Sequence, residues 1–198
     1  MTPRRSSTSE VNQPARRIHP SNRTHIVLLR GINLVKRNRI AMPELRAALE
    51  AAGFHDVRTY VQSGNVLLTS TSSPEDVATR VNAVVKDRFG FDVMVLVRSR
   101  DELTHIVERN PLQAIAAEPK AHLVTFLSAE LPKALIDRLT ALATHEKFEV
   151  VGREIYSWHP AGFAHSPLWE RLAAKSLGVA ATSRNWTTVT TLLAMAAE

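Results

Sequence analysis

The pattern of apolar and polar positions predicts two stretches of strands and helices along this chain. The first opens with a near-continuous apolar run over residues 25–32, which is typical of a strand buried on both faces. Helices are predicted where apolar residues recur at helical spacing and a glycine follows. The predicted order is strand 25–32, helix 43–52, strands 57–61 and 66–69 around a Ser63-Gly64 turn, helix 74–89, strand 91–97 and a short helix near 101–107.

The second stretch repeats this order after Asn110-Pro111 and a linker over residues 112–120. Its predicted elements are strand 122–127, helix 132–143, strands 148–151 and 154–158 around Gly152-Arg153, helix 167–177, strand 179–183 and helix 185–197. Each stretch therefore has the β-α-β-β-α-β order of a ferredoxin-like plait. The predicted fold is α+β, with two tandem ferredoxin-like plaits and a C-terminal helix. We expect a tail at 1–22, an N-terminal domain at 23–111 and a C-terminal domain at 112–198.

Polar residues collect at two places in the first predicted plait, after its first strand and around its hairpin turn. Right-handed crossovers bring the end of the first strand, the start of the first helix and this hairpin to one edge of the sheet. Guanidinium groups match phosphate or carboxylate oxygens, and Ala41-Met42 offers the first helix no capping side chain, so its amides are open to an anion. The predicted ligand-binding residues at this edge are Arg30, Asn33, Arg37, Asn38, Gln62, Ser63 and Asn65.

Purely structural explanations of the same residues stay open. The loop after the first strand is equally typical of a solvated basic loop in which Arg30 and Asn33 brace the hairpin. Gln62 to Asn65 has the composition that a tight turn requires, and the turn explanation is favoured there. Ser63 is not expected to be a nucleophile, because the sequence ties no histidine or lysine to it.

Arg184 is predicted to add a second cation to this site from far along the chain. Asn185 is placed to cap the terminal helix, and Trp186 begins the apolar stripe of that helix. Arg184 precedes the cap and belongs to neither feature. We therefore expect Arg184 to point into the groove between the two plaits, since domain interfaces often hold ligand pockets.

The net charge of +6 changes this picture little, because much of it lies in the tail. Five of the 25 basic residues and one of the 19 acidic residues lie up to Arg23, which leaves 20 basic and 18 acidic residues in the body. The tail has too few apolar residues to offset its ordering entropy and is predicted to be disordered, with a polyanion-binding arm as the alternative. Nucleic acid is a disfavoured partner, because strand one lacks the aromatic residues of RNA-binding plaits.

Several other classes of site are excluded or disfavoured by composition. The chain has no cysteine, no apolar run that could span a bilayer and no signal peptide, which favours a cytoplasmic protein without a membrane partner. Its eight histidines show no metal-binding spacing, and its acidic pairs fit first helical turns better than acid–base catalysis. We expect no metal and no cofactor.

Four motifs together resemble a bacterial domain-of-unknown-function family, DUF1697. They are LLRGIN, the NRIAMPELRAAL helix, the YVQSGNVLL hairpin and ATSRNWTTVTTLL, and the resemblance covers about Thr24 to Leu193. It implies two α/β plaits and no particular activity. Where related sequences have a glycine pair, this chain has Val35 and Lys36, which disfavours a phosphate loop of bare amides. The matching positions are Arg30, Gly31, Asn33, Asn38, Gln62, Ser63, Gly64, Asn65, Arg184, Asn185 and Trp186.

The sequence predicts a protein that binds a small anionic ligand at the loop edge of the first plait and in the groove between the plaits. An enzyme acting on a phosphorylated or nucleotide-like substrate is the first alternative, and whether any reaction is catalysed stays open. A nucleic-acid-associated protein that uses the basic tail is the second. The enzyme alternative requires a general acid or base in the cleft, and the nucleic-acid alternative requires binding that weakens steeply with salt.

Overall fold

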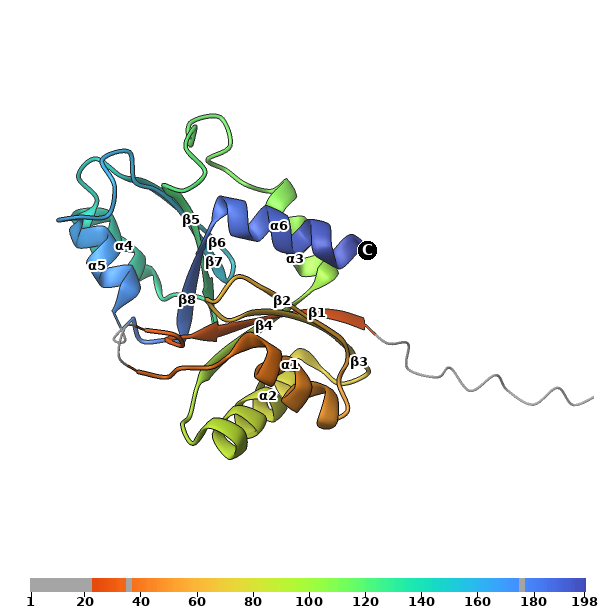
Figure 1. Ribbon diagram of the computed structural model, residues 1–198. Helices are drawn as coiled ribbons and strands as arrows, with labels where there is room; N and C mark the ends of the chain where they lie inside the picture. Colours follow the sequence, from red (N-terminus) through yellow and green to blue (C-terminus); the bar gives the residue numbers. More distant parts are fainter. Residues whose placement is uncertain (1–22, 35–36, 175–176) are drawn as a thin grey trace, which may run out of the picture.

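The computed structural model of this chain describes residues 23–34, 37–174 and 177–198, which form two four-stranded antiparallel sheets and six helices (Figure 1). The predicted tail at 1–22 lies outside the described residues, as do Val35 and Lys36. The coarse expectation of an α+β protein built from two sheets is confirmed.

The first sheet has the strand order β2-β3-β1-β4, and every neighbouring pair in it is antiparallel. β1 is a central strand in which Val27 pairs with Val66 on one side and with Val97 on the other. Its apolar run is fully buried, as the sequence predicts. The elements of this half are β1 (Arg23–Arg30), α1 (Met42–Ala51), β2 (His55–Tyr60), β3 (Asn65–Ser70), α2 (Pro74–Phe89), β4 (Met94–Ser99) and α3 (Arg100–Glu108).

The second sheet repeats this arrangement with the order β6-β7-β5-β8, again antiparallel throughout. β5 takes the central place that β1 has in the first sheet, and all six of its residues are buried. The elements of this half are β5 (His122–Leu127), α4 (Lys133–Leu142), β6 (Lys147–Val151), β7 (Glu154–Trp158), α5 (Pro167–Ala173), β8 (Ala181–Asn185) and α6 (Trp186–Ala197).

Apolar side chains fill three layers between these elements. One cluster lies between the first sheet and helices α1 and α2, and another lies between the second sheet and helices α4 and α5. The middle cluster joins the two halves: Ile26 and Leu28 of β1 share it with Val124 and Phe126 of β5 and with Val189 of α6. Residues of both predicted domains therefore bury one common core.

Local signals place the helix starts and the second hairpin correctly. The Ser73 hydroxyl accepts a hydrogen bond from the amide of Asp76 at 3.1 Å, and Oδ1 of Asn185 accepts one from the amide of Thr188 at 2.9 Å. Both are the side-chain caps that the sequence predicts. Gly152 joins β6 to β7 with a φ of 57°, which suits the two-residue turn.

Two boundaries differ from the prediction in ways that affect the site. Helix α5 ends at Ala173 instead of Leu177, because Ala174 already has an extended backbone with φ −67° and ψ 150°. Strand β8 runs two residues further than predicted and ends at Asn185. Arg184 is therefore a strand residue that pairs with Val124 of β5, and not a residue of a loop before the last helix.

Candidate functional site

The loop between β1 and α1 is held in shape by two asparagines. Asn33 and Asn38 both have left-handed backbones, with φ of 52° and 54°. Nδ2 of Asn33 donates to the carbonyl oxygens of Ile40 at 3.0 Å and Gln62 at 2.8 Å, and Oδ1 accepts from the Ile40 amide at 2.8 Å. Nδ2 of Asn38 donates to the Gly31 carbonyl at 3.0 Å. Asn33 thus ties the loop to the β2–β3 hairpin, and Asn38 closes the loop on itself.

Three of the predicted ligand-binding residues line one pocket beside this loop. Arg30, Arg37 and Asn38 share a cavity of about 500 Å³, which we call the basic pocket. Its remaining lining residues are Gly31, Leu34, Asp92 and Met94. The structure therefore brings Arg30 and Arg37 together in one pocket at one edge of the first sheet.

Some charged side chains of the basic pocket have partners in the protein, and others do not. One Nη of Arg30 donates to the carbonyl oxygen of Ala173, the last residue of α5, at 2.6 Å. The carboxylate of Asp92 lies 3.1 Å from Nζ of Lys86, so a cation outside the pocket offsets its charge. Arg37 is exposed, and no residue in the described part of the chain pairs with its side chain. The pocket is left with an excess of positive charge.

The start of helix α1 lies outside this pocket. Its N-cap residue Ala41 makes no side-chain cap, as the sequence predicts, and Pro43 occupies the first turn. Neither residue lines the basic pocket. Any anion in the pocket is therefore held by side chains of the loop, without direct help from this helix terminus.

The residues Gln62, Ser63 and Asn65 have structural contacts in the β2–β3 hairpin. Gln62 contributes its carbonyl oxygen to Asn33, and Nδ2 of Asn65 donates to the Ser63 hydroxyl at 3.0 Å. Asn65 is completely buried, whereas Gln62 and Ser63 are exposed. None of the three lines the basic pocket. Their contacts fit the turn explanation, and a direct role in ligand binding stays a prediction.

Arg184 lies between the two sheets, where its guanidinium joins β8 to the hairpin and to β1. Its Nε donates to Oδ1 of Asn65, and one Nη donates to the carbonyl oxygen of Leu29 at 2.8 Å and to that of Ser63 at 3.2 Å. The other Nη donates to the hydroxyl of Thr182 at 2.8 Å and to the carbonyl of Ser183 at 2.8 Å. Every donor group of Arg184 thus has an acceptor inside the protein, and Arg184 is only 9% exposed.

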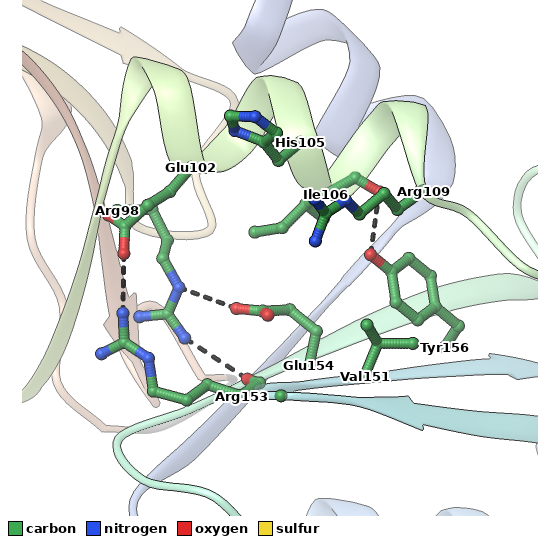
Figure 2. Close-up of a pocket in the computed structure, with 10 residues that line it drawn as sticks. Arg98, Glu102, His105, Ile106, Arg109, Val151, Arg153, Glu154 and Tyr156 are labelled. Carbon is green, nitrogen blue, oxygen red and sulfur yellow. Dashed lines mark hydrogen bonds and ion pairs between the residues drawn. The ribbon is translucent and has the colours of Figure 1, made fainter.

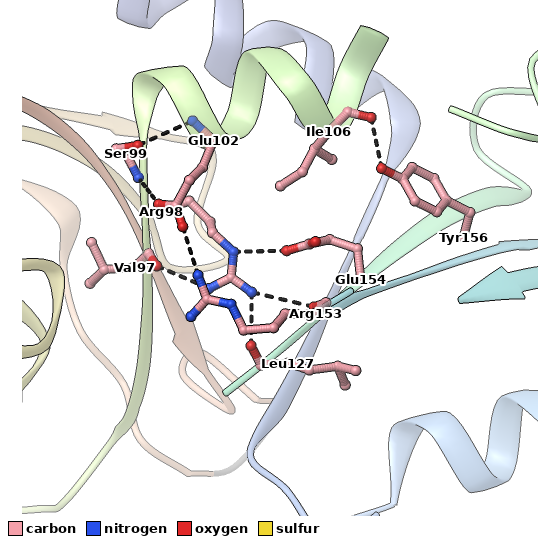
Figure 3. Close-up of polar contacts among 9 residues, drawn as sticks. All are labelled: Val97, Arg98, Ser99, Glu102, Ile106, Leu127, Arg153, Glu154 and Tyr156. Carbon is pink, nitrogen blue, oxygen red and sulfur yellow. Dashed lines mark hydrogen bonds and ion pairs between the residues drawn. The ribbon is translucent and has the colours of Figure 1, made fainter. Parts of the chain in front are cut away.

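A second group of charged residues lies where α3 meets the β6–β7 hairpin, and the sequence interpretation did not single it out. Arg98 is 2% exposed; its Nε donates to Oε1 of Glu154 at 2.8 Å, and one Nη donates to the Leu127 carbonyl at 2.8 Å (Figure 3). Arg153 of the turn donates to Oε1 of Glu102 at 2.6 Å. The only signal in the sequence was an arginine within an otherwise apolar strand.

Two general classes of site are absent from the described residues. Among residues 23–34, 37–174 and 177–198, no group of three or more histidine, aspartate or glutamate side chains is arranged to hold a metal ion. Within the same residues, no helix has both the length and the apolar character that a membrane crossing requires.

The comparison with known proteins supports the family resemblance. The model of a family described as "Protein of unknown function (DUF1697)" matches residues 23–156, which is more than half of the chain. This chain belongs to the DUF1697 family. The match runs from β1 into β7, as far as Tyr156, and therefore includes the basic pocket loop, the β2–β3 hairpin and the Arg98 group.

A solved structure supports the fold of this DUF1697 protein along most of its length. The conserved bacterial protein SP0830 from Streptococcus pneumoniae matches with a TM-score of 0.73 and 20% sequence identity. The match covers 89% of the present chain and 99% of SP0830. At this identity the likeness concerns the fold alone. No curated protein sequence matches the chain significantly.

Proposed function

We propose that this protein binds a small anionic ligand in the basic pocket. The observation that carries the proposal is the convergence of two guanidinium groups, Arg30 and Arg37, on one cavity whose single carboxylate is already paired with a lysine. Guanidinium groups recognise phosphate and carboxylate through parallel charge-assisted hydrogen bonds. A bound anion would supply the partner that Arg37 lacks among the described residues.

The hydrogen bonds of Asn33 and Asn38 support this proposal. Asn33 is bonded to the hairpin, and Asn38, which follows Arg37 directly, is bonded to the Gly31 carbonyl, so the described ends of the loop are held by side chains. The contact between Arg30 and the end of α5 holds the second guanidinium in place. Preorganised donors lose less conformational entropy when a ligand binds.

The residues that line the basic pocket favour ligand binding without catalysis. Asp92 is the one carboxylate among the lining residues, which include no histidine or lysine, and its side chain is 65% exposed and paired with Lys86. An exposed carboxylate that is held by a lysine is poorly placed to exchange a proton with a bound substrate. An enzyme acting on a phosphorylated substrate therefore has weaker support, and so does a contribution from Arg184, whose donors are already used.

We also infer that each half of the molecule is a ferredoxin-like plait. The strand orders β2-β3-β1-β4 and β6-β7-β5-β8 support this assignment, because the central pair in each case is formed by the first and third strands of the half. Two helices pack on the outer face of each sheet, as the plait requires. The basic pocket then lies beside the first βα loop.

The proposed function is tested by titrating the protein with inorganic phosphate, nucleotides, sugar phosphates and dicarboxylates while its thermal unfolding is followed. A ligand of the native state raises the unfolding temperature. We expect Arg37→Gln to lower the affinity for the tightest-binding of these anions about tenfold, because a charge-assisted hydrogen bond is lost.

The matched control for this test is Arg138→Gln, which removes an exposed arginine of α4 that does not line the basic pocket. It should bind the anion like the unmodified protein. Equal weakening in the two variants would reduce the effect to net charge and contradict the proposal. Failure of all the anions to raise the unfolding temperature would contradict it as well.

A further inference from the structure

A second pocket lies between helix α3 and the β6–β7 hairpin (Figure 2). Its volume is about 280 Å³, just under the roughly 300 Å³ at which pockets for drug-sized ligands begin. We call it the junction pocket, because its walls come from both halves of the chain. Its lining residues are Arg98, Glu102, His105, Ile106, Arg109, Val151, Gly152, Arg153, Glu154 and Tyr156. The volume suits a ligand of few heavy atoms.

Most of the charge in the junction pocket is neutralised within the protein. Arg98 pairs with Oε1 of Glu154 at 2.8 Å, and Arg153 pairs with Oε1 of Glu102 at 2.6 Å (Figure 3). The second oxygen of Glu102 accepts a hydrogen bond from the amide of Ser99 at 2.7 Å. These three contacts leave the guanidinium of Arg109 and one oxygen of the ion-paired Glu154 carboxylate for a ligand.

The first of these groups is the guanidinium of Arg109, which has no hydrogen-bond or ion-pair partner in the described part of the chain. Arg109 is the C-cap residue of α3, and its side chain lies on the α3 side of the pocket, opposite Glu154 and Tyr156 of β7 (Figure 2). Its charge acts on the Tyr156 hydroxyl: burial raises the pKa of Tyr156, and Arg109 opposes that rise. Arg109 therefore offers an unpaired cation on the α3 side of the pocket.

The second group is the carboxylate of Glu154. Only Oε1 contacts Arg98, and Oε2 has no partner among the described residues although the side chain is just 13% exposed. The Tyr156 hydroxyl donates to the carbonyl oxygen of Ile106 at 2.8 Å, so the lone pairs of its oxygen are left to accept. Tyr156 is only 1% exposed, so the acceptor that the β7 wall offers to a hydrogen-bond donor or a cation is Oε2 of Glu154.

We propose that the junction pocket binds a small zwitterion of the α-amino-acid class, with its carboxylate on Arg109 and its ammonium group on Oε2 of Glu154. A simple anion would leave Oε2 of Glu154 facing it, and a simple cation would leave Arg109 facing it. A zwitterion gives a partner to the Arg109 guanidinium and to the free oxygen of Glu154 at once. This site is separate from the basic pocket, since the junction pocket includes Arg98 near the end of β4 and the basic pocket includes Met94 at its start.

The test is isothermal titration of the full chain with the standard free L-amino acids. Any amino acid that binds is then compared with its des-amino acid, which lacks the ammonium group, and with its α-amide, which lacks the carboxylate. We expect at least one amino acid to bind, and each analogue to bind about tenfold more weakly or worse, because each loses one charge-assisted contact.

The variant for this test is Arg109→Gln, with Arg100→Gln as its matched control. Both residues are exposed arginines at the ends of α3, and Arg100 does not line the pocket. Arg109→Gln should lower the affinity for the amino acid about tenfold without changing the unfolding temperature. Arg100→Gln should leave the affinity unchanged.

Three results would overturn this proposal. They are the absence of binding by every amino acid, binding that survives Arg109→Gln, and a des-amino acid that binds as well as its parent. Where binding survives Arg109→Gln, its loss in Arg37→Gln would place the amino acid in the basic pocket instead. None of the three results contradicts anion binding by Arg37, so the two proposals fail separately.

Discussion

At the scale of single residues, buried histidines give this protein a dependence on pH. His122 is 1% exposed and its ring stacks on Trp186, with 4.7 Å between the ring centroids and 15° between the planes. Burial lowers the pKa of His122 to about 4. Burial also lowers the pKa of His159, which is completely buried in the second half. The folded protein therefore favours the neutral form of both imidazoles.

Acid should consequently destabilise the protein through His122 in a defined pH range. The folded pKa lies below the ordinary value of 6.5, so the unfolded chain binds the proton first and stability falls as pH drops from about 6.5 toward about 4. His122 alone should cost about 2 kcal/mol of unfolding free energy between about pH 7 and pH 5. Urea denaturation at both pH values measures this change.

The variant His122→Phe provides the control for this prediction, because it retains a ring against Trp186 but cannot be protonated. Its loss of stability between the two pH values should be smaller than that of the unmodified protein by about the same 2 kcal/mol. An identical loss in the two proteins would show that the charge of His122 does not govern the acid response.

At the scale of elements, the β2–β3 hairpin depends on one glycine. Gly64 has a φ of 78°, and a Cβ atom at this position would lie 2.9 Å from both the Cβ and the carbonyl oxygen of Leu29. The Gly64 carbonyl in turn accepts a hydrogen bond from the Leu29 amide at 2.8 Å. Any side chain would push the hairpin away from β1, which is the central strand.

Replacing Gly64 by alanine should therefore cost more stability than the backbone conformation alone explains. Gly152 also has a positive φ, of 57°, but a Cβ there would meet no atom within 4 Å. Gly152→Ala should thus cost about 1 to 2 kcal/mol for the left-handed backbone. Gly64→Ala should cost roughly 2 kcal/mol beyond that, because backbone must also move.

Urea denaturation of the two glycine variants decides the point. Equal losses of stability would mean that the hairpin can move away from Leu29 at little cost in free energy. The close approach of Gly64 to Leu29 would then contribute little to stability. A larger loss in Gly64→Ala would confirm that the glycine of the QSGN motif is required by packing.

Local patterns predict these elements well where the determining contacts are close in sequence. The caps at Ser73 and Asn185 and the turn at Gly152 depend on residues within a few positions, and the structure has them as predicted. The predicted end of α5 was wrong. The pattern of apolar residues continues to Leu177, whereas the backbone is already extended at Ala174.

The candidate site shows the same division. The convergence of Arg30, Arg37 and Asn38 follows from the loop after β1, which is a local feature. By contrast, Arg98 and its partner Glu154 are 56 residues apart in the sequence. Arg184 and its partner Asn65 are 119 residues apart. No local pattern distinguishes an arginine that binds a ligand from one that joins two sheets.

At the scale of the whole molecule, two buried arginines join the halves that the sequence presents as separate domains. Arg98 of the first half reaches the β6–β7 hairpin, and Arg184 of the second half reaches β1 and the β2–β3 hairpin. Together with the shared apolar core, these contacts favour one cooperative unfolding transition.

Arg184→Ala should therefore destabilise the whole protein strongly. Burial lowers the pKa of Arg184 to about 10, so the residue is still charged at neutral pH, and its removal leaves the Leu29 carbonyl and Asn65 without their donors. The expected loss is on the order of 3 kcal/mol. Arg138→Ala, at an exposed position, should change stability by less than about 0.5 kcal/mol. A loss near zero in Arg184→Ala, measured by urea denaturation, would mean that the halves do not depend on this contact.

Binding of a small anion in the basic pocket is tested best by an NMR titration of the ¹⁵N-labelled protein with inorganic phosphate. We expect saturable shifts of the amides of Gly31, Arg37, Asn38 and Met94, which line the pocket. In Arg37→Gln the same shifts should need about tenfold more phosphate to saturate, whereas Arg138→Gln should titrate like the unmodified protein. Shifts that do not saturate, or that occur only away from these residues, would show that phosphate does not bind in the basic pocket.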